Sequence, residues 1–143
     1  MAALLDDRRR TGPLKREGAR RPLVLVVEDD EDMRFLLRTM LELQGYRVAE
    51  ARDGEEGLAS AGRERPELVL MDVTLPRMDG LAATRRIRSD AALEGVPVVF
   101  LSGHAQPSFR AAALDAGGTD FIVKPFALDE LASVVERHLR ADA

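Results

Sequence analysis

From Pro22 onward the sequence alternates short, continuous apolar runs with longer amphipathic segments, and this alternation constrains the fold more than any other feature. Apolar runs such as LVLVV at residues 23–27 are typical of strands that are covered on both faces. Five such strand–helix units in succession predict an α/β fold, a doubly wound five-stranded parallel sheet with five helices in a three-layer sandwich.

The boundaries of the predicted elements follow from apolar spacing and from capping residues. Strands are expected at residues 23–27, 46–51, 68–71 (closed by Asp72), 96–101 and 121–123. The first helix carries Met33, Leu36, Leu37, Met40 and Leu41 and ends at Gly45. The second is capped by Asp53 and the third by Asp79. The fourth spans about residues 107–116, and the last carries Leu128, Leu131, Val134, Val135 and Leu139 on one side.

The length and composition exclude several classes of protein. A chain of 143 residues is close to the usual size of one domain. It holds no Cys, so disulfides, thiolate metal sites and cysteine nucleophiles are excluded. No apolar run is long enough to cross a bilayer and no signal peptide is visible, so we expect a cytoplasmic protein without a membrane partner.

The charge is divided unevenly along the chain. Residues 1–21 hold seven basic against three acidic residues, a net charge of +4, and because the whole chain carries −4, the remainder carries −8. We therefore expect a basic, flexible tail over residues 1–21 and one compact domain over residues 22–142. The acidic charge of that domain argues against nucleic acid as its direct partner.

Polar and charged residues follow four of the five predicted strands. Glu28 and Asp29 follow the first strand, Asp72 ends the third, Ser102 follows the fourth and Lys124 follows the fifth. Doubly wound sheets bind ligands beyond the carboxyl ends of their strands, so these side chains are expected to converge on one small surface. Clustered carboxylates repel one another unless they bind a cation, and a site made of oxygen ligands alone favours Mg²⁺.

Lys124 and Ser102 indicate what such a magnesium site is for. An ammonium group and a hydroxyl beside Mg²⁺ are suited to holding a phosphoryl group. An aspartate carboxylate can act as the nucleophile of phosphoryl transfer and form an acyl phosphate. We therefore predict that Asp72 attacks a phosphoryl group, while Lys124 neutralises its charge and Ser102 donates a hydrogen bond to it.

Four motifs, in order and at matching spacing, resemble those of the receiver domains of bacterial response regulators. They are VVEDDEDMR at residues 26–34, VLMDVTLPRMDG at residues 69–80, FLSG at residues 100–103 and FIVKPF at residues 121–126. Each motif alone is weakly specific, but the set is highly specific. The resemblance covers about residues 22–140 and implies a flavodoxin-like sheet with strand order 2-1-3-4-5.

The resemblance also implies a role for each residue of the magnesium site. It implies that Asp72 is the phosphoacceptor, that Asp29 ligates Mg²⁺ directly and that Glu28 acts on the metal through water. The backbone carbonyl of Thr74 is implied as a further metal ligand. Lys124 resembles the phosphate-binding lysine of the family, whose bond to the following proline is expected in cis.

A second group of residues resembles the part of the family that controls output. Ser102 and Phe121 resemble the switch pair, in which the hydroxyl turns toward the phosphoryl group and the aromatic ring rotates inward. The surface of the fourth helix, fifth strand and fifth helix then changes, which is a two-state response to a local charge event. Thr74 and His104 resemble the residues at the positions that, in the family, tune the lifetime of the phosphoryl group.

The resemblance implies that the chain is a signalling domain of a two-component phosphorelay rather than an enzyme acting on an external substrate. Its phosphodonor would be a sensor histidine kinase or a histidine phosphotransfer protein. No effector segment follows the last predicted helix, so a stand-alone receiver is expected, with a downstream protein as its target. We expect a monomer or a weak homodimer.

Three alternatives stay open at the level of sequence. A haloacid-dehalogenase-like phosphatase also uses Asp, Mg²⁺ and Lys, but it needs an acidic residue where this chain has Thr74. A pseudo-receiver would act as an interaction module without phosphorylation, and a receiver cut from a longer regulator would have the same motifs. Among single residues, Glu28 and Asp29 could merely cap a helix, Asp30 is interpreted as a cap, and His138 as a cation that suits a helix end.

Overall fold

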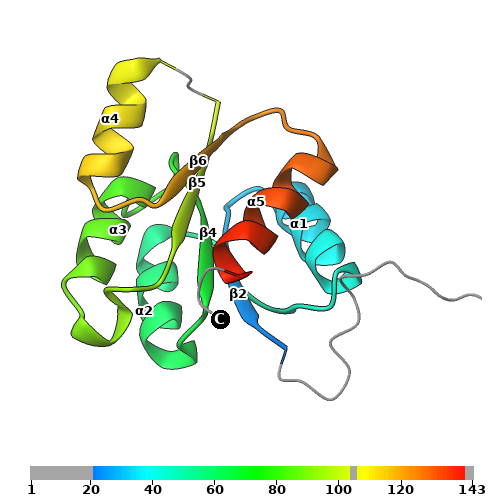
Figure 1. Cartoon of the computed structure of the whole chain (residues 1–143). Helices are drawn as coiled ribbons and strands as arrows, with labels where there is room; N and C mark the ends of the chain where they lie inside the picture. The colour runs from blue at the N-terminus through cyan, green and yellow to red at the C-terminus, as the bar shows by residue number, and fades with distance from the viewer. Residues whose placement is uncertain (1–20, 104–105, 141–143) are drawn as a thin grey trace, which may run out of the picture.

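The computed structural model describes residues 21–103 and 106–140, and within them one sheet of five parallel strands forms the centre of the molecule (Figure 1). The strands are β2 (Leu23–Val27), β3 (Arg47–Ala51), β4 (Leu68–Asp72), β5 (Val98–Ser102) and β6 (Asp120–Val123), and Figure 1 labels each of them except β3. Their order in the sheet is β3-β2-β4-β5-β6, which confirms the expected order 2-1-3-4-5. The predicted tail, apart from Arg21, and His104 lie outside the described residues.

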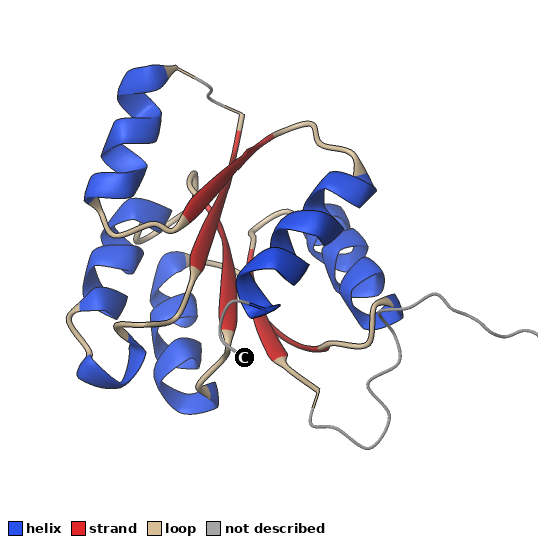
Figure 2. Cartoon of the chain, viewed as in Figure 1, coloured by secondary structure: helices blue, strands red, loops and turns tan. Residues whose placement is uncertain are grey.

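Helices cover both faces of the sheet, as Figure 2 shows by colour. They are α1 (Glu31–Leu43), α2 (Gly54–Glu64), α3 (Gly80–Arg88), α4 (Pro107–Asp115) and α5 (Leu128–Arg140). A short 3₁₀ helix, η3 (Ala91–Leu93), was not predicted. Helices α1 and α5 lie on one face, and α2, α3 and α4 lie on the other, which confirms the three-layer sandwich.

The alternation of side chains along the strands creates two separate cores. On β2, Val24 and Val26 point toward α1 and α5, whereas Leu25 and Val27 point toward α2 and α3, and all four are fully buried. Because both faces of the strand are covered, each position has to be apolar, and this explains the continuous run in the sequence.

Aspartate side chains cap the N-termini of α1, α2 and α3. The side chain of Asp30 accepts a hydrogen bond from the Met33 N–H (2.9 Å) at the start of α1, as the capping interpretation required. Asp53 and Asp79 cap α2 and α3 in the same way, which confirms both predictions. Each cap satisfies a backbone donor that the helix leaves unpaired and contributes about 1 kcal/mol.

Two predicted strands begin later than expected. β5 begins at Val98 rather than at residue 96, because the Val96 N–H donates to Leu93 O (3.1 Å) in a turn that follows η3. β3 begins at Arg47 because the N–H of residue 46 returns to Leu41 O (3.1 Å) at the end of α1. In both cases a local turn takes the hydrogen bond that pairing in the sheet would need.

The C-terminal half of α5 is tied to β6 by a cluster that sequence reasoning missed. Oδ2 of Asp120 lies 2.7 Å from Nη2 of Arg137 and 2.7 Å from Nε2 of His138. Burial raises the pKa of Asp120, but hydrogen bonds from His138, the Phe121 N–H and Arg137 outweigh it, so this pKa lies below its ordinary value. His138 therefore contacts a carboxylate as well as lying near a helix end.

Candidate functional site

The carboxyl ends of four adjacent strands meet at one edge of the sheet. Asp72 is the last residue of β4 and Ser102 the last of β5, while Glu28 and Lys124 directly follow β2 and β6. The parallel register pairs Val27 with Met71, and this aligns the ends of β2 and β4. Parallel strands bring their ends together in this way, and therefore residues far apart in the sequence lie side by side.

Three carboxylates converge at this edge. One oxygen each from Glu28, Asp29 and Asp72 lies within 4.8 Å of the others. Glu28 and Asp72 are buried and Asp29 is exposed. Burial raises the pKa of Glu28 to about 7; the negative charge of Asp72 raises it as well, against the hydrogen bond from the Asp30 N–H and the charge of Lys124.

Lys124 is the cation that faces this cluster. Its Nζ atom lies 3.2 Å from Oε1 of Glu28 and 3.4 Å from Oδ2 of Asp72. Burial lowers the pKa of Lys124, but the carboxylates of Asp72 and Glu28 outweigh it, so the pKa lies above its ordinary value and the group stays charged. The bond to Pro125 is cis, as the resemblance implied. The Lys124 N–H donates to Ser102 O (2.7 Å) and thereby places these residues side by side.

The donor set fits a small, hard divalent cation. All three converging groups are carboxylates, and the single ammonium of Lys124 leaves an excess of negative charge between them. Mg²⁺ takes oxygen ligands and keeps several waters, and the exposed Asp29 leaves the cluster open to solvent. The loop after β4 is fixed by the Thr74 N–H, which donates to Oδ1 of Asp72 (3.2 Å). Metal ligation by the Thr74 carbonyl stays a prediction.

The predicted switch residue Phe121 is held by two residues of α4 that sequence reasoning missed. Its ring meets the ring of Phe109 edge to face, with centroids 6.1 Å apart. The guanidinium of Arg110 lies 5.1 Å from the centre of the Phe121 ring. Ser102 is buried at the end of the neighbouring strand β5. The structure thus brings the predicted pair onto adjacent strands and adds a contact to α4.

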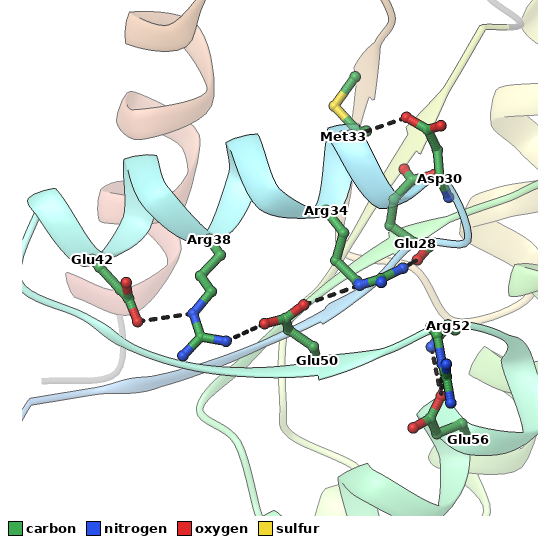
Figure 3. Close-up of polar contacts among 9 residues, drawn as sticks. All are labelled: Glu28, Asp30, Met33, Arg34, Arg38, Glu42, Glu50, Arg52 and Glu56. Carbon is green, nitrogen blue, oxygen red and sulfur yellow. Dashed lines mark hydrogen bonds and ion pairs between the residues drawn. The ribbon is translucent and has the colours of Figure 1, made fainter.

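Arg34 of α1 also contacts the site and was not singled out from the sequence. Its Nη1 donates to the carbonyl oxygen of Glu28 (2.9 Å), and its Nε donates to Oε1 of Glu50 (3.0 Å) on β3 (Figure 3). Arg34 falls inside the first of the four motifs, but its partners could be found only once α1 was placed against β3.

Comparisons with known proteins agree with this geometry. A family model described as the response regulator receiver domain matches residues 24–136. The response regulator MprA of Mycobacterium leprae is 41% identical over 117 residues, which are 82% of this chain and 50% of that protein. The chain therefore spans about half the length of the curated relatives that it matches.

Solved structures of receiver proteins are also similar to this chain in sequence and fold. The receiver domain of the sensor histidine kinase PA1611 of Pseudomonas aeruginosa, whose crystal structure holds a magnesium ion in the active-site cleft, is 36% identical with a TM-score of 0.78, over 84% of this chain and 98% of that one. The chemotaxis protein CheY4 of Vibrio cholerae is 29% identical with a TM-score of 0.80, over 82% of this chain and 98% of that one. Among the described residues, no helix combines the length and apolar character that a bilayer crossing requires. The family model matches residues 24–136, which are most of the chain, and this match shows that the chain belongs to the response regulator receiver domains.

Proposed function

We propose that this receiver domain accepts a phosphoryl group on Asp72, with Mg²⁺ bound beside it, and that the phosphorylated form presents a changed surface to a partner protein. The observation that carries the proposal is the convergence of Glu28, Asp29 and Asp72 opposite the Lys124 ammonium. A lysine that served only to form a structural salt bridge would need one carboxylate. Three carboxylates around one ammonium are suited to a site that also takes a divalent cation and an anion.

Each residue has a distinct part in the proposed chemistry. A carboxylate oxygen of Asp72 attacks the phosphorus of a phosphohistidine, so that a P–O bond forms and the P–N bond to the donor imidazole breaks. The Lys124 ammonium and the Ser102 hydroxyl hold oxygens of the transferred group. Glu28, Asp29, Asp72 and the Thr74 carbonyl would hold Mg²⁺, which supplies positive charge next to the phosphoryl oxygens when it is bound.

The proposed output passes through Phe121. When the Ser102 hydroxyl turns toward the phosphoryl group, the Phe121 ring is released to move, and its contacts with Phe109 and Arg110 on α4 change. The partners that fit this role are a sensor histidine kinase or a histidine phosphotransfer protein as donor and a downstream protein as target. The signalling relatives and the magnesium ion in the Pseudomonas aeruginosa receiver support this assignment.

The proposal is tested by the intact mass of the protein after incubation with acetyl phosphate and Mg²⁺. We expect one labile phosphoryl adduct that is absent from Asp72→Asn and absent when a chelator removes the metal. Asp30→Asn is the matched control, because Asp30 caps α1 and its replacement retains a capping side chain. An adduct that persists in Asp72→Asn would overturn the assignment of the acceptor. No adduct in the wild type would favour an interaction module that works without phosphorylation.

A further inference from the structure

We propose that Arg34 is a positioning residue of the acidic site: it holds the peptide that joins Glu28 to Asp29, so that Mg²⁺ affinity depends on a side chain outside the metal-binding set. The inference deepens the function proposed above and rests on its magnesium site. The contact that points to this role is the hydrogen bond from Nη1 of Arg34 to the carbonyl oxygen of Glu28, 2.9 Å long (Figure 3).

This hydrogen bond lies where the sheet stops supporting the chain. β2 ends at Val27, which is also its last residue paired with β4. The Glu28 N–H still donates to Ala51 O (3.0 Å) at the end of β3, but its carbonyl is taken by Arg34 instead of by a strand. The guanidinium thus hydrogen-bonds the backbone one residue beyond the last strand pairing. This residue is Glu28, and the acidic side chains of Glu28 and Asp29 project from this point.

Arg34 is itself held in place from two directions. Its Nε donates to Oε1 of Glu50 (3.0 Å) on β3, and its backbone N–H donates to Asp30 O (2.9 Å) in the first turn of α1. Only 12% of the Arg34 side chain is exposed. A planar guanidinium can donate to two acceptors at a fixed angle, which a lysine ammonium on a flexible stem cannot reproduce. The side chain therefore connects α1, β3 and the segment that carries Glu28 and Asp29.

The position of the Glu28–Asp29 peptide matters because Mg²⁺ demands near-octahedral geometry. The Asp29 side chain is exposed, so the location of its carboxylate depends on its backbone rather than on surrounding side chains. If the peptide rotates, the Asp29 and Glu28 carboxylates no longer converge with Asp72. Residues that orient metal ligands from outside the binding set typically change metal affinity by about 10-fold to 100-fold when they are replaced.

Electrostatic repulsion alone predicts that replacing Arg34 strengthens Mg²⁺ binding, which is the opposite of the change expected from a positioning residue. Removing a positive charge close to a cation site should strengthen Mg²⁺ binding, because the repulsion between the two cations is lost. Positioning by Arg34 predicts weaker binding. The sign of the change in Mg²⁺ affinity therefore distinguishes a positioning residue from a nearby charge, and Arg34→Lys, which keeps the charge, separates the two effects further.

Arg38 offers a matched control on the same helix. It contacts the same Glu50 carboxylate and also Glu42 (3.0 Å), and within the described part of the chain its guanidinium pairs with these two side chains rather than with Glu28 or Asp29. Its side chain is 45% exposed. Arg38→Ala removes one positive charge and one partner of Glu50, and leaves the Arg34–Glu28 hydrogen bond in place.

The test is the Mg²⁺ dissociation constant of the full chain, measured by isothermal titration calorimetry with MgCl₂ for the wild type and three variants. We expect Arg34→Ala and Arg34→Lys to bind Mg²⁺ about tenfold more weakly. Arg38→Ala should stay within about twofold, because a solvent-exposed charge is screened by salt. Amide hydrogen exchange of metal-free protein is the second readout, and the amides of Asp29 and Asp30 should exchange faster in both Arg34 variants but not in Arg38→Ala.

Three outcomes would overturn the inference. The first is an Arg34→Ala protein that binds Mg²⁺ as tightly as the wild type or more tightly, and the second is an equal loss of affinity in Arg38→Ala. In either case the wild type still binds Mg²⁺, so the proposed function stands. The third is a wild type that binds no Mg²⁺, which removes the proposed site and this inference together. Exchange rates in the metal-free protein show whether a variant that binds weakly is still folded.

Discussion

The Nζ atom of Lys124 lies 3.4 Å from Oδ2 of Asp72, so the ammonium group that follows β6 faces the carboxylate that ends β4. The same ammonium is 3.2 Å from Glu28. The ammonium group of Lys124 is thus shared by two carboxylates. An anion that approaches Asp72 also comes close to this ammonium group.

Replacing Lys124 should separate metal binding from phosphoryl transfer. In Lys124→Met we expect phosphorylation by acetyl phosphate to slow by at least about tenfold, because the charge that holds the phosphoryl oxygens is lost. Mg²⁺ affinity should rise, because a cation has been removed from the carboxylate cluster. Adduct formation followed by mass and Mg²⁺ titration measure the two effects. Parallel losses of both would contradict the assigned role.

The raised pKa of Glu28 makes the stability of the metal-free protein dependent on pH. In the folded state the pKa of Glu28 is about 7, whereas the ordinary pKa of a glutamate side chain is 4.5. Between these values the folded state binds more protons than the unfolded state, so the contribution of Glu28 to stability falls as the pH rises.

Glu28→Gln should therefore raise the free energy of unfolding of metal-free protein at pH 8, by on the order of 1–3 kcal/mol. The gain should become small at pH 4, where Glu28 is largely protonated in both states. Chemical denaturation at the two pH values, with chelator present, measures it. Mg²⁺ should stabilise the wild type but not the variant, and a variant less stable than the wild type at pH 8 would contradict the argument.

Gly80 allows the start of α3 to approach the end of β4, the strand that ends at Asp72. A Cβ atom at this position would lie 2.4 Å from the carbonyl oxygen of Asp72. Gly80→Ala should therefore lower the free energy of unfolding by about 1–3 kcal/mol and slow adduct formation on Asp72, because one of the two segments has to move.

Gly62 provides the matched control for that substitution. It lies on the exposed side of α2, and a Cβ there would meet nothing within 4 Å. Gly62→Ala should stabilise the protein by up to about 1 kcal/mol through helix propensity and leave phosphorylation unchanged. Equal effects of the two substitutions on adduct formation would show that the contact with Asp72 is not the cause.

The contact between Arg110 and Phe121 should set the resting position of the switch. Arg110→Ala removes a cation–π contact of about 0.5–1 kcal/mol, which frees the ring to leave its place against α4. A phosphoryl analogue such as beryllofluoride should then bind about 2-fold to 5-fold more tightly. Arg85→Ala, an exposed arginine of α3, is the control. If Arg110→Ala binds beryllofluoride with unchanged affinity, Phe121 is a packing residue and not part of the switch.

Local patterns were enough to predict most of the fold and the list of candidate site residues. The apolar runs identified the strands, aspartates identified the starts of α2 and α3, and the residues after each strand identified Glu28, Asp72 and Lys124. These predictions succeed because strand burial, capping and strand-end position depend on residues that are close in the sequence.

Contacts of long polar side chains were not predictable in the same way. Arg88 illustrates this, because it donates to the carbonyl oxygens of Gly117 (2.9 Å), Leu93 (3.2 Å) and Glu94 (3.1 Å), and burial lowers its pKa. Nothing in the spacing of α3 indicates these acceptors. They exist only because the turn after η3 and the loop after α4 pass the end of the same helix.

Local sequence patterns specify the five strand–helix units and put carboxylates and a lysine after the strands. Packing of the elements against one another was needed to show that Lys124 contacts both Glu28 and Asp72, that Arg34 donates to the Glu28 carbonyl, and that α4 contacts Phe121. The physical reason is distance along the chain. Periodicity and capping act over a few residues, whereas these contacts join elements whose approach is set by the packing of both cores.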